Sequence, residues 1–404
     1  MKRLIIIAMI GFVLNDCHNP NTDFVVDLST QEGYGPFMPS QRIVGPSQDS
    51  LIFTNVPEVI DEYVVRNFNL PPEQKILMLI GSIKDKRVIM IDSDNDKDFG
   101  NEKILEYEYP LSIEEQKEIA ESLPAISSKV EYVENGQAII RNIKIRPTPY
   151  TGPLTMSFNT DNEVEKKYYL FASVPEYKKG KLKIRDSELN VYISNSFIRM
   201  DYLKEYVSIL IAPQTQAMLQ SKDNIPYTIG DIFNVNGYDY LIDSISKWGD
   251  KLFIKYIEKN ERPAGISVGY YLPKFEAKYL DGTVFDIAKY SGKYILLDFW
   301  GTWCVPCIEL IPELKKMNSD FSDKNFELIS VAFDDNPAKV TDFVVKEDMS
   351  WSHLFVSTSQ NDDNSVINKL KISKYPTTIL ISPEGKIIGR DLTMDELFGI
   401  MNEI

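Results

Sequence analysis

The hydrophobic pattern changes abruptly near residue 265, and this change constrains the fold more than any other feature of the sequence. Before it, short runs rich in β-branched and aromatic residues are bounded by turn formers, which is typical of strands. After it, strand-like runs alternate with segments of helical period. Such alternation indicates βαβ units, in which helices cover a central sheet. We therefore expect a mainly-β N-terminal region followed by an α/β domain.

Three glycine-containing pairs are predicted to be turns between strands of the N-terminal region. Asn135-Gly136 and Asn236-Gly237 each separate two apolar runs. Asparagine and glycine both tolerate the positive φ that a tight hairpin turn requires. Lys179-Gly180 lies between YYLFASV and KLKIRD and is predicted to form the third turn.

One helix and one break complete the predicted organisation. Ser112 begins a capping box with Glu115, and Pro124 closes the helix that follows. The run PTPYTGP, at residues 147–153, predicts a break between two β-rich modules. The expected division of the chain is a signal segment at residues 1–17, β-rich modules at 18–150 and 151–262, and the α/β domain at 266–404.

Composition excludes several classes of function. The chain has 404 residues, which predicts two or three domains at about 100–200 residues each. It carries 59 acidic and 44 basic side chains, for a net charge of −15. A surface this negative repels phosphate groups and argues against nucleic-acid binding and against electrostatic adhesion to lipid. With only His18 and His353 available, a Ser-His-Asp hydrolase or a His-rich metal centre is also disfavoured.

The first seventeen residues have the pattern of an export signal. Lys2 and Arg3 precede an apolar run over residues 4–14, and Cys17 follows. This run is too short to cross a bilayer, which takes about 20 residues, but it suits the apolar core of a signal peptide. A cysteine at this place resembles a bacterial lipoprotein signal, in which the cysteine is lipidated. The alternative is a plain secretory signal with Cys17 incidental.

Cys304 and Cys307 are the main candidate catalytic residues. A buried strand over Tyr294–Trp300 is predicted to end just before them, and an amphipathic helix begins between them. Cys304 therefore lies at a helix N-terminus, where free N–H groups favour a thiolate. Pro306 falls in the first helical turn, where its missing N–H costs nothing. Cys307 follows one turn later, close enough to close a small disulfide ring.

Two other interpretations of the Cys-x-x-Cys spacing are open. A structural zinc site needs four nitrogen or sulfur ligands, and the sequence offers no second cysteine pair. A purely structural disulfide would close a loop too short to remove much entropy from the unfolded chain. Catalytic redox use is therefore the interpretation that we favour.

A family resemblance follows from these residues and their surroundings. The segment DFWGTWCVPC resembles the active site of thioredoxins, and VGYYLPKF at residues 268–275 resembles the entry to the AhpC/TSA–redoxin and TlpA-like envelope branch. Pro312 stands where this superfamily kinks the active-site helix, and Tyr375-Pro376 matches its cis-proline turn. Residues 326–348 match the insertion of the TlpA-like branch. The resemblance covers residues 266–404 and implies an α/β thioredoxin-like fold.

The resemblance also suggests roles for individual side chains. An aspartate such as Asp298 occupies the matching strand position in thioredoxins, where burial would raise its pKa and let it take the proton of Cys307. The alternative is a polar residue that is satisfied by hydrogen bonds near the strand end. A glutamate that some family members use is replaced here by Leu310. We expect the client to contact Trp303, Pro306, Tyr375 and Pro376.

Peroxidase activity is not expected. It needs a proline and a hydroxyl residue at set distances before the cysteine. The corresponding positions hold Leu297 and Gly301.

A run of acidic residues in the N-terminal region resembles the start of a calcium loop. Aspartate recurs at every second position after a predicted strand, which would place several carboxylates around one cation. The pattern departs from an EF-hand, because the tight-turn glycine is replaced by Lys97. A solvated turn is the alternative. The expected ligands are Asp92, Asp94, Asp96 and Asp98.

These observations predict an exported thiol:disulfide oxidoreductase, anchored by lipid at Cys17 in a bacterial cell envelope and facing the periplasm or the surface. Its partners would be client proteins with disulfides and a membrane thiol reductase that supplies electrons. Apart from the calcium, no cofactor is expected beyond the redox-active disulfide itself. The alternative function is a surface lipoprotein whose β-rich modules bind a ligand and whose dithiol is auxiliary.

Overall fold

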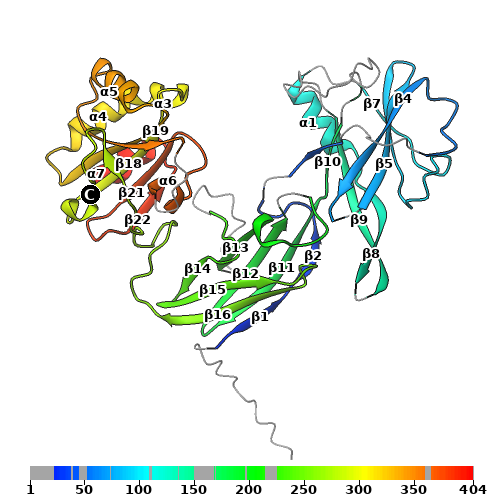
Figure 1. Ribbon diagram of the computed structural model, residues 1–404, viewed down its shortest axis with the longest axis horizontal. Helices are drawn as coiled ribbons and strands as arrows, with labels where there is room; N and C mark the ends of the chain where they lie inside the picture. Colours follow the sequence, from blue (N-terminus) through cyan, green and yellow to red (C-terminus); the bar gives the residue numbers. More distant parts are fainter. Residues whose placement is uncertain are drawn as a thin grey trace, which may run out of the picture. The chain divides into compact units, whose positions relative to one another are not determined.

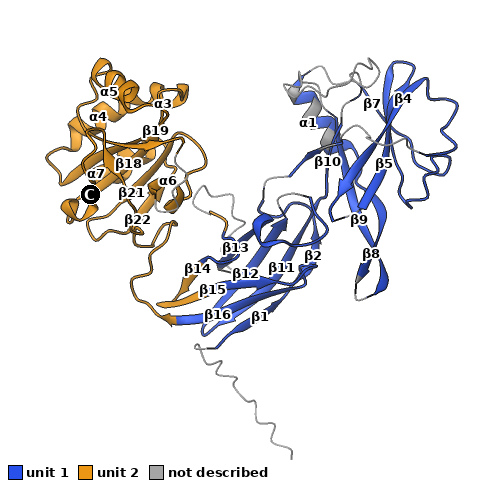
Figure 2. Ribbon diagram, in the orientation of Figure 1, with its two compact units in different colours: residues 1–216, 227–231, 241–257 blue, residues 217–226, 232–240, 258–404 orange. Residues whose placement is uncertain are grey.

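A computed structural model shows, among the residues that it describes, five β-sheets and a set of short helices (Figure 1). Two compact units divide the chain, one of residues 1–216, 227–231 and 241–257, the other of residues 217–226, 232–240 and 258–404 (Figure 2). Within the described residues, no helix is both long and apolar enough to span a bilayer. The structure describes residues 22–37, 40–44, 52–72, 74–108, 112–134, 136–149, 168, 170–195, 198–213, 225–359 and 365–403.

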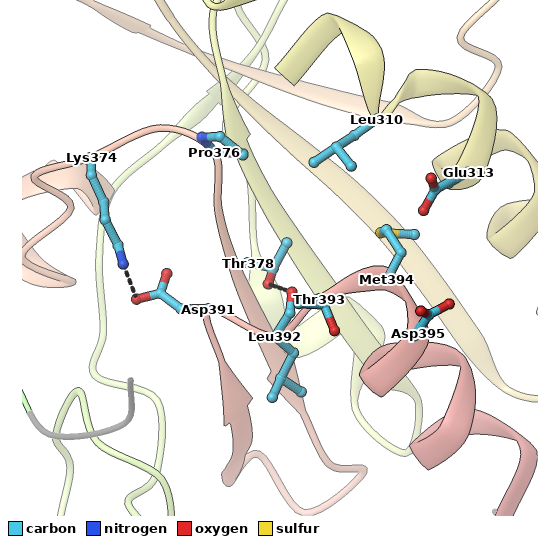
Figure 3. A pocket seen from close by; sticks show the side chains of 10 residues that line it. All are labelled: Leu310, Glu313, Lys374, Pro376, Thr378, Asp391, Leu392, Thr393, Met394 and Asp395. Carbon is cyan, nitrogen blue, oxygen red and sulfur yellow. Dashed lines mark hydrogen bonds and ion pairs between the residues drawn. The ribbon is translucent and has the colours of Figure 1, made fainter. Parts of the chain in front are cut away.

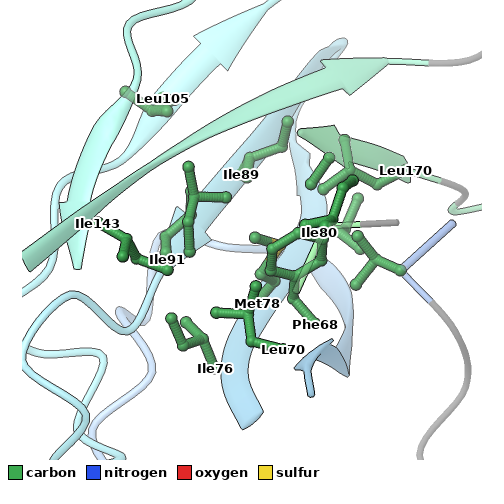
Figure 4. Packing of buried hydrophobic residues seen from close by; sticks show 14 of the residues in the cluster. Phe68, Leu70, Ile76, Met78, Ile80, Ile89, Ile91, Leu105, Ile143 and Leu170 are labelled. Atoms are coloured by element: carbon green, nitrogen blue, oxygen red, sulfur yellow. The ribbon is translucent and has the colours of Figure 1, made fainter. Parts of the chain in front are cut away.

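Two antiparallel sheets with a shared apolar core form the first part of the N-terminal region. Phe68, Ile80 and Ile143 are among the side chains that pack into this core (Figure 4). In the order in which the strands pair, the sheets consist of β4 (Glu62–Leu70), β5 (Gln74–Ile83), β6 (Lys86–Ile91) and β7 (Leu105–Tyr107), and of β3 (Arg42–Ile43), β10 (Leu170–Ser173), β9 (Gln137–Pro149) and β8 (Ile126–Glu134).

The predicted helix and one predicted hairpin turn are confirmed. The helix α1 (Ile113–Ser122) begins after Ser112, whose hydroxyl accepts the N–H of Glu115 at 3.1 Å, and it ends before Pro124. Asn236 and Gly237 take φ values of 53° and 82° in the turn between two strands. Asn135 and the signal segment with Cys17 lie outside the described residues.

Two further sheets complete the β-rich region, and both include strands from the start of the chain. Residues 24–32 pair with strands beyond residue 175, which differs from the predicted division at residue 150. Sheet partners need not be neighbours in sequence. The sheets consist of β1 (Phe24–Asp27), β16 (Lys251–Lys259), β15 (Tyr238–Ile245) and β14 (Ile232–Val235), and of β13 (Val207–Pro213), β12 (Ser187–Asn195), β11 (Glu176–Ile184) and β2 (Ser29–Glu32), and the short 3-10 helix η1 (Lys204–Tyr206) precedes β13.

The turn predicted at Lys179-Gly180 is wrong, because both residues lie inside β11. A Cβ atom placed on Gly180 would lie 2.6 Å from Cγ1 of Val26 and 2.7 Å from the carbonyl oxygen of Asp27. The glycine therefore lets β1 approach closely. It does not supply a positive φ.

The C-terminal domain is built on one six-stranded sheet. Its strands β18, β19 and β20 are parallel, whereas β21 is antiparallel to β18. Helices α4 and α7 pack against one face. In sheet order the strands are β17 (Lys278–Tyr279), β20 (Ser352–Ser357), β19 (Phe326–Asp334), β18 (Tyr294–Trp300), β21 (Thr377–Ile381) and β22 (Ile387–Arg390), and the helices are η2 (Ile287–Tyr290), α3 (Val305–Glu309), α4 (Ile311–Phe321), α5 (Pro337–Lys346), α6 (Val366–Lys369) and α7 (Met394–Glu403).

Candidate active site

Cys304 and Cys307 are joined in a disulfide whose Cα atoms are 5.3 Å apart. Cys304 is the N-cap of α3, and its sulfur accepts the N–H of Cys307 at 3.3 Å. Helix α3 ends at Leu310, and α4 begins directly afterwards with Pro312 in its first turn. The helix is therefore interrupted at the place where the sequence predicts a kink.

Strand β18 ends at Trp300, four residues before Cys304. Its side chains alternate between the two faces, so that Leu297 and Phe299 pack on one face. Trp300 packs on the other face, in a cluster that includes both cysteines. Both faces of β18 are therefore covered, and this explains why the strand that leads to the cysteine pair is almost wholly apolar.

Both cysteine residues are buried in the disulfide form. Cys304 is 4% exposed and Cys307 is 3% exposed, whereas the neighbouring Trp303 is 52% exposed. Exposure therefore does not distinguish the two cysteines in this state. The difference between them is positional, since Cys304 precedes the helix and Cys307 lies within its first turn.

The predicted client-contacting residues come together around the disulfide. The Trp303 ring lies 5.3 Å from the Tyr375 ring, nearly perpendicular to it, and the Tyr375 ring stacks on Phe333 at 5.6 Å. Tyr375 also packs against the cluster that holds both cysteines and forms a cis peptide bond with Pro376. Burial raises the pKa of Tyr375 to about 12, so its hydroxyl stays protonated. Pro306 is exposed in the first turn of α3.

A cavity of about 480 Å³ is lined in part by Pro376 of the cis-proline turn. In Figure 3 the Leu310 side chain points toward Pro376, and Lys374 forms an ion pair with Asp391 at 3.1 Å. Glu313 and Asp395 add two further carboxylates to its lining, so the cavity is acidic as a whole. Sequence reasoning missed this cavity, because its residues come from three separate segments.

Asp298 lies on the face of β18 that packs under the active-site helices. Side chains two residues apart on a strand share a face, and Leu296 packs with α4 while Trp300 packs with the cysteines. Asp298 is 2% exposed, and its Oδ2 accepts the hydroxyl of Ser330 at 2.8 Å. Burial raises the pKa of Asp298 to about 6, although the Ser330 hydrogen bond opposes this rise.

Sequence reasoning missed the partners of Asp298. Ser330 is the residue paired with Asp298 in the parallel register of β18 and β19, and it accepts the indole N–H of Trp351 at 2.8 Å. His353 lies beside Trp351, with its Nε2 3.2 Å from the carbonyl oxygen of Met349. Burial lowers the pKa of His353 to about 4, so it is neutral at physiological pH.

Only two of the four predicted calcium ligands, Asp92 and Asp94, lie in one cluster of carboxylates. Carboxylate oxygens of Asp92, Asp94 and Glu102 lie within 4.8 Å of one another. The Asp98 carboxylate turns away and accepts hydrogen bonds from Asn55 and Gly100, both at 2.7 Å. Asp96 accepts the N–H of Asp98 and the side-chain amide of Asn101. Calcium binding stays a prediction, now with Glu102 beside two of the four expected ligands.

Comparisons with known proteins match the C-terminal domain. The AhpC/TSA family matches residues 268–390. Thiol-disulfide oxidoreductase ResA of Oceanobacillus iheyensis is 30% identical over 145 residues, which cover 34% of this chain and 72% of the relative. ResA of Bacillus cereus is 27% identical over 140 residues, which cover 35% and 76%. The solved thioredoxin domain of a thiol-disulfide oxidoreductase from Bacteroides vulgatus is 28% identical, with a TM-score of 0.32, over 34% of this chain and 98% of that chain.

The region that the family model matches, residues 268–390, has the fold of a thioredoxin-superfamily redoxin domain, and the protein is an oxidoreductase. The chain belongs to the AhpC/TSA family through this domain, and its relatives are thiol-disulfide oxidoreductases. The predicted family and fold class, including the mainly-β N-terminal region, are confirmed.

Proposed function

We propose that this protein is an exported thiol:disulfide oxidoreductase that reduces the disulfides of client proteins with Cys304 and Cys307. One observation carries the proposal: the Cys304–Cys307 disulfide lies at the start of α3, against the exposed Trp303 and the Tyr375-Pro376 turn. The names of the relatives support the same class of reaction.

The reaction starts from the reduced dithiol. The Cys304 thiolate attacks one sulfur of the client disulfide, and the other client sulfur leaves as a thiolate that takes a proton from water. A mixed disulfide now joins Cys304 to the client. Cys307 loses its proton and attacks the Cys304 sulfur, which releases the second client sulfur as a thiolate that takes a proton from water, and leaves the Cys304–Cys307 disulfide. Two electrons have passed from the protein to the client.

We propose that Asp298 accepts the proton that Cys307 loses. This carboxylate lies on the β18 face that the active-site helices cover, and a carboxyl with a pKa near 6 is mostly ionised at neutral pH and able to accept a proton. Ser330 and Trp351 form a hydrogen-bonded chain that fixes its orientation.

The dithiol must be reduced again after each cycle. No histidine lies between the two cysteines, and no lysine or arginine is adjacent to them in sequence. Little beyond the helix terminus therefore stabilises the thiolate, which favours a moderately reducing protein. The electrons would come from a membrane thiol reductase, because the compartment itself is oxidising.

The location proposed is a bacterial cell envelope, with a lipid anchor at Cys17. The support is the sequence of residues 1–17 alone: a basic start, an apolar run and then the cysteine. Metabolic labelling with a radioactive fatty acid tests this directly. Label on the wild-type chain and none on Cys17→Ser is the expected result, and label on neither would contradict the anchor.

Insulin reduction by the full chain tests the proposed activity. We expect the wild-type chain to precipitate insulin chains in the presence of a dithiol donor, and both Cys304→Ser and Cys307→Ser to lose this activity. Negligible turnover by the wild-type chain would contradict the proposal and favour a binding protein whose dithiol is auxiliary.

A further inference from the structure

The loop before Cys304 is held by the end of strand β19. Trp300 pairs with Ala332 in the parallel register of β18 and β19, so that two residues further on Thr302 faces Asp334. Asp334 Oδ2 accepts both the backbone N–H of Thr302 at 3.0 Å and its hydroxyl at 2.6 Å. A single carboxylate oxygen thus fixes the residue that stands two positions before Cys304.

The second oxygen of Asp334 is also fully used. Oδ1 accepts the Lys339 ammonium at 3.0 Å and the backbone N–H of Asp335 at 2.9 Å. The Asp334 side chain is 1% exposed, whereas that of Lys339 is 49% exposed. Burial alone would raise the pKa of Asp334, but the hydrogen bonds from Thr302 and Lys339 hold it well below its usual value. Asp334 is therefore a buried anion paired with a half-exposed cation.

Gly301 and Trp303, the neighbours of Thr302, also contact the end of strand β19. The indole N–H of Trp303 donates to the carbonyl oxygen of Phe333 at 2.9 Å. A Cβ atom on Gly301 would lie 2.8 Å from that carbonyl oxygen, so there is no room for a side chain. The three residues before Cys304 are thus in direct contact with Phe333 and Asp334, the last two residues of β19.

We propose that Asp334 is the positioning residue of the dithiol: it fixes Thr302, two residues before Cys304, and together with Lys339 it sets the charge beside Cys304. The inference rests on the proposed function only in taking the Cys304–Cys307 pair as redox-active. Lys339 belongs to α5, so the insertion of residues 326–348 would contribute directly to the redox properties of the site.

The proposal predicts opposite shifts of the dithiol/disulfide equilibrium when the charge of Asp334 or that of Lys339 is removed. A nearby anion disfavours a thiolate, and a nearby cation favours it. Removing the charge of Asp334 should stabilise the reduced dithiol and make the protein more oxidising, whereas removing the charge of Lys339 should make it more reducing. Simple loosening of the loop would not give opposite shifts.

Redox equilibrium of the full chain with glutathione tests the charge effect without any client. We expect Asp334→Asn to shift the dithiol/disulfide equilibrium about threefold toward the dithiol, and Lys339→Met about threefold toward the disulfide. Asp335→Asn is the matched control, because it removes a neighbouring charge that is 73% exposed, and it should shift the equilibrium by much less. Shifts in the same direction for Asp334→Asn and Lys339→Met, or no shift in either, would overturn the charge role.

The positioning role has its own test, which does not depend on a change of charge. Thr302→Val removes the hydroxyl that donates to Asp334, and we expect insulin reduction to fall about tenfold in kcat/KM, as for a lost hydrogen bond to a charged group. Thr302→Ser keeps the hydroxyl and should restore the rate. Equal rates for both variants would overturn the positioning role. A wild-type dithiol that does not equilibrate with glutathione would instead contradict the proposed function.

Discussion

Two buried carboxyl groups, one in the N-terminal region and one in the redox domain, have similarly raised pKa values but lie in different surroundings. Burial is the largest cause for both Asp92 and Asp298, and it raises each pKa to about 6. Asp92 accepts two backbone N–H groups, from Asp96 and Lys97, and lies beside the Glu102 carboxylate. Asp298 accepts one hydroxyl, from Ser330, inside an apolar layer.

The comparison shows that a shifted pKa alone does not identify a function. Oxygen atoms from several carboxylates converge around Asp92, an arrangement that would favour a cation. Around Asp298 the neighbouring residues Leu296 and Trp300 are apolar, and the cysteine pair packs in the same layer, an arrangement that favours the movement of a proton. Substitution at each site should therefore affect different properties.

The largest expected effect is on the pH dependence of stability. The folded-state pKa of Asp298, about 6, lies above the value in an unfolded chain, so this group makes folding less favourable as pH rises from about 4 to 6. Asp298→Asn removes that loss and should be more stable than the wild type at pH 7 by about 3 kcal/mol. Urea unfolding of both oxidised proteins at pH 4 and pH 7 measures the difference. A stability gap that does not grow with pH would contradict the buried charge.

The sequence predicts those parts of the site that depend on residues close to one another in the chain. The dithiol, the capping cysteine and the helix break before Pro312 depend on residues that are close in sequence, and each lies where the pattern indicates. Ser330 and Asp334 act on residues more than thirty positions away, through the register of two parallel strands. No local pattern reveals that register.

The N-terminal region shows the same limit. Strands β4, β5 and β6 are apolar runs bounded by turn formers, and these are the local signals that predict strands in this region. The turn predicted at Gly180 is wrong because the need for a glycine there comes from Val26 and Asp27, which lie about 150 positions earlier in the chain. The pairing of β1 and β2 with later strands has the same long-range origin.

A smaller effect is expected on the second step of the redox cycle. Asp298→Asn removes the group that we propose accepts the Cys307 proton, and the decay of a mixed disulfide should slow at least about tenfold at pH 7. The wild-type rate should rise through pH 6 as Asp298 ionises, and the variant should lack this inflection. Asp92→Asn is the matched control and should leave the rate unchanged. Stopped-flow quenching with a disulfide peptide measures the decay; a wild-type inflection that persists in Asp298→Asn would assign the proton to another group.

The smallest expected effect concerns calcium. Calcium at about five times its dissociation constant should stabilise the N-terminal region by about 1 kcal/mol, seen as a higher unfolding temperature than in chelator. The effect should fade as pH falls through 6, because protons compete for Asp92. Asp94→Asn should abolish it, whereas Asp98→Asn should retain it because that carboxylate bonds to Asn55 and Gly100. Identical unfolding in calcium and in chelator would exclude a cation at this loop.

Trapping of mixed disulfides tests the central claim most directly. The full chain carrying Cys307→Ser is expressed in its native host, and its covalent complexes are resolved on non-reducing gels beside those of Cys304→Ser. We expect client complexes on Cys307→Ser that disappear with reductant, and none on Cys304→Ser, because we propose that Cys304, the N-cap of α3, attacks first. Complexes on Cys304→Ser in the absence of complexes on Cys307→Ser would contradict the assignment of the two cysteines.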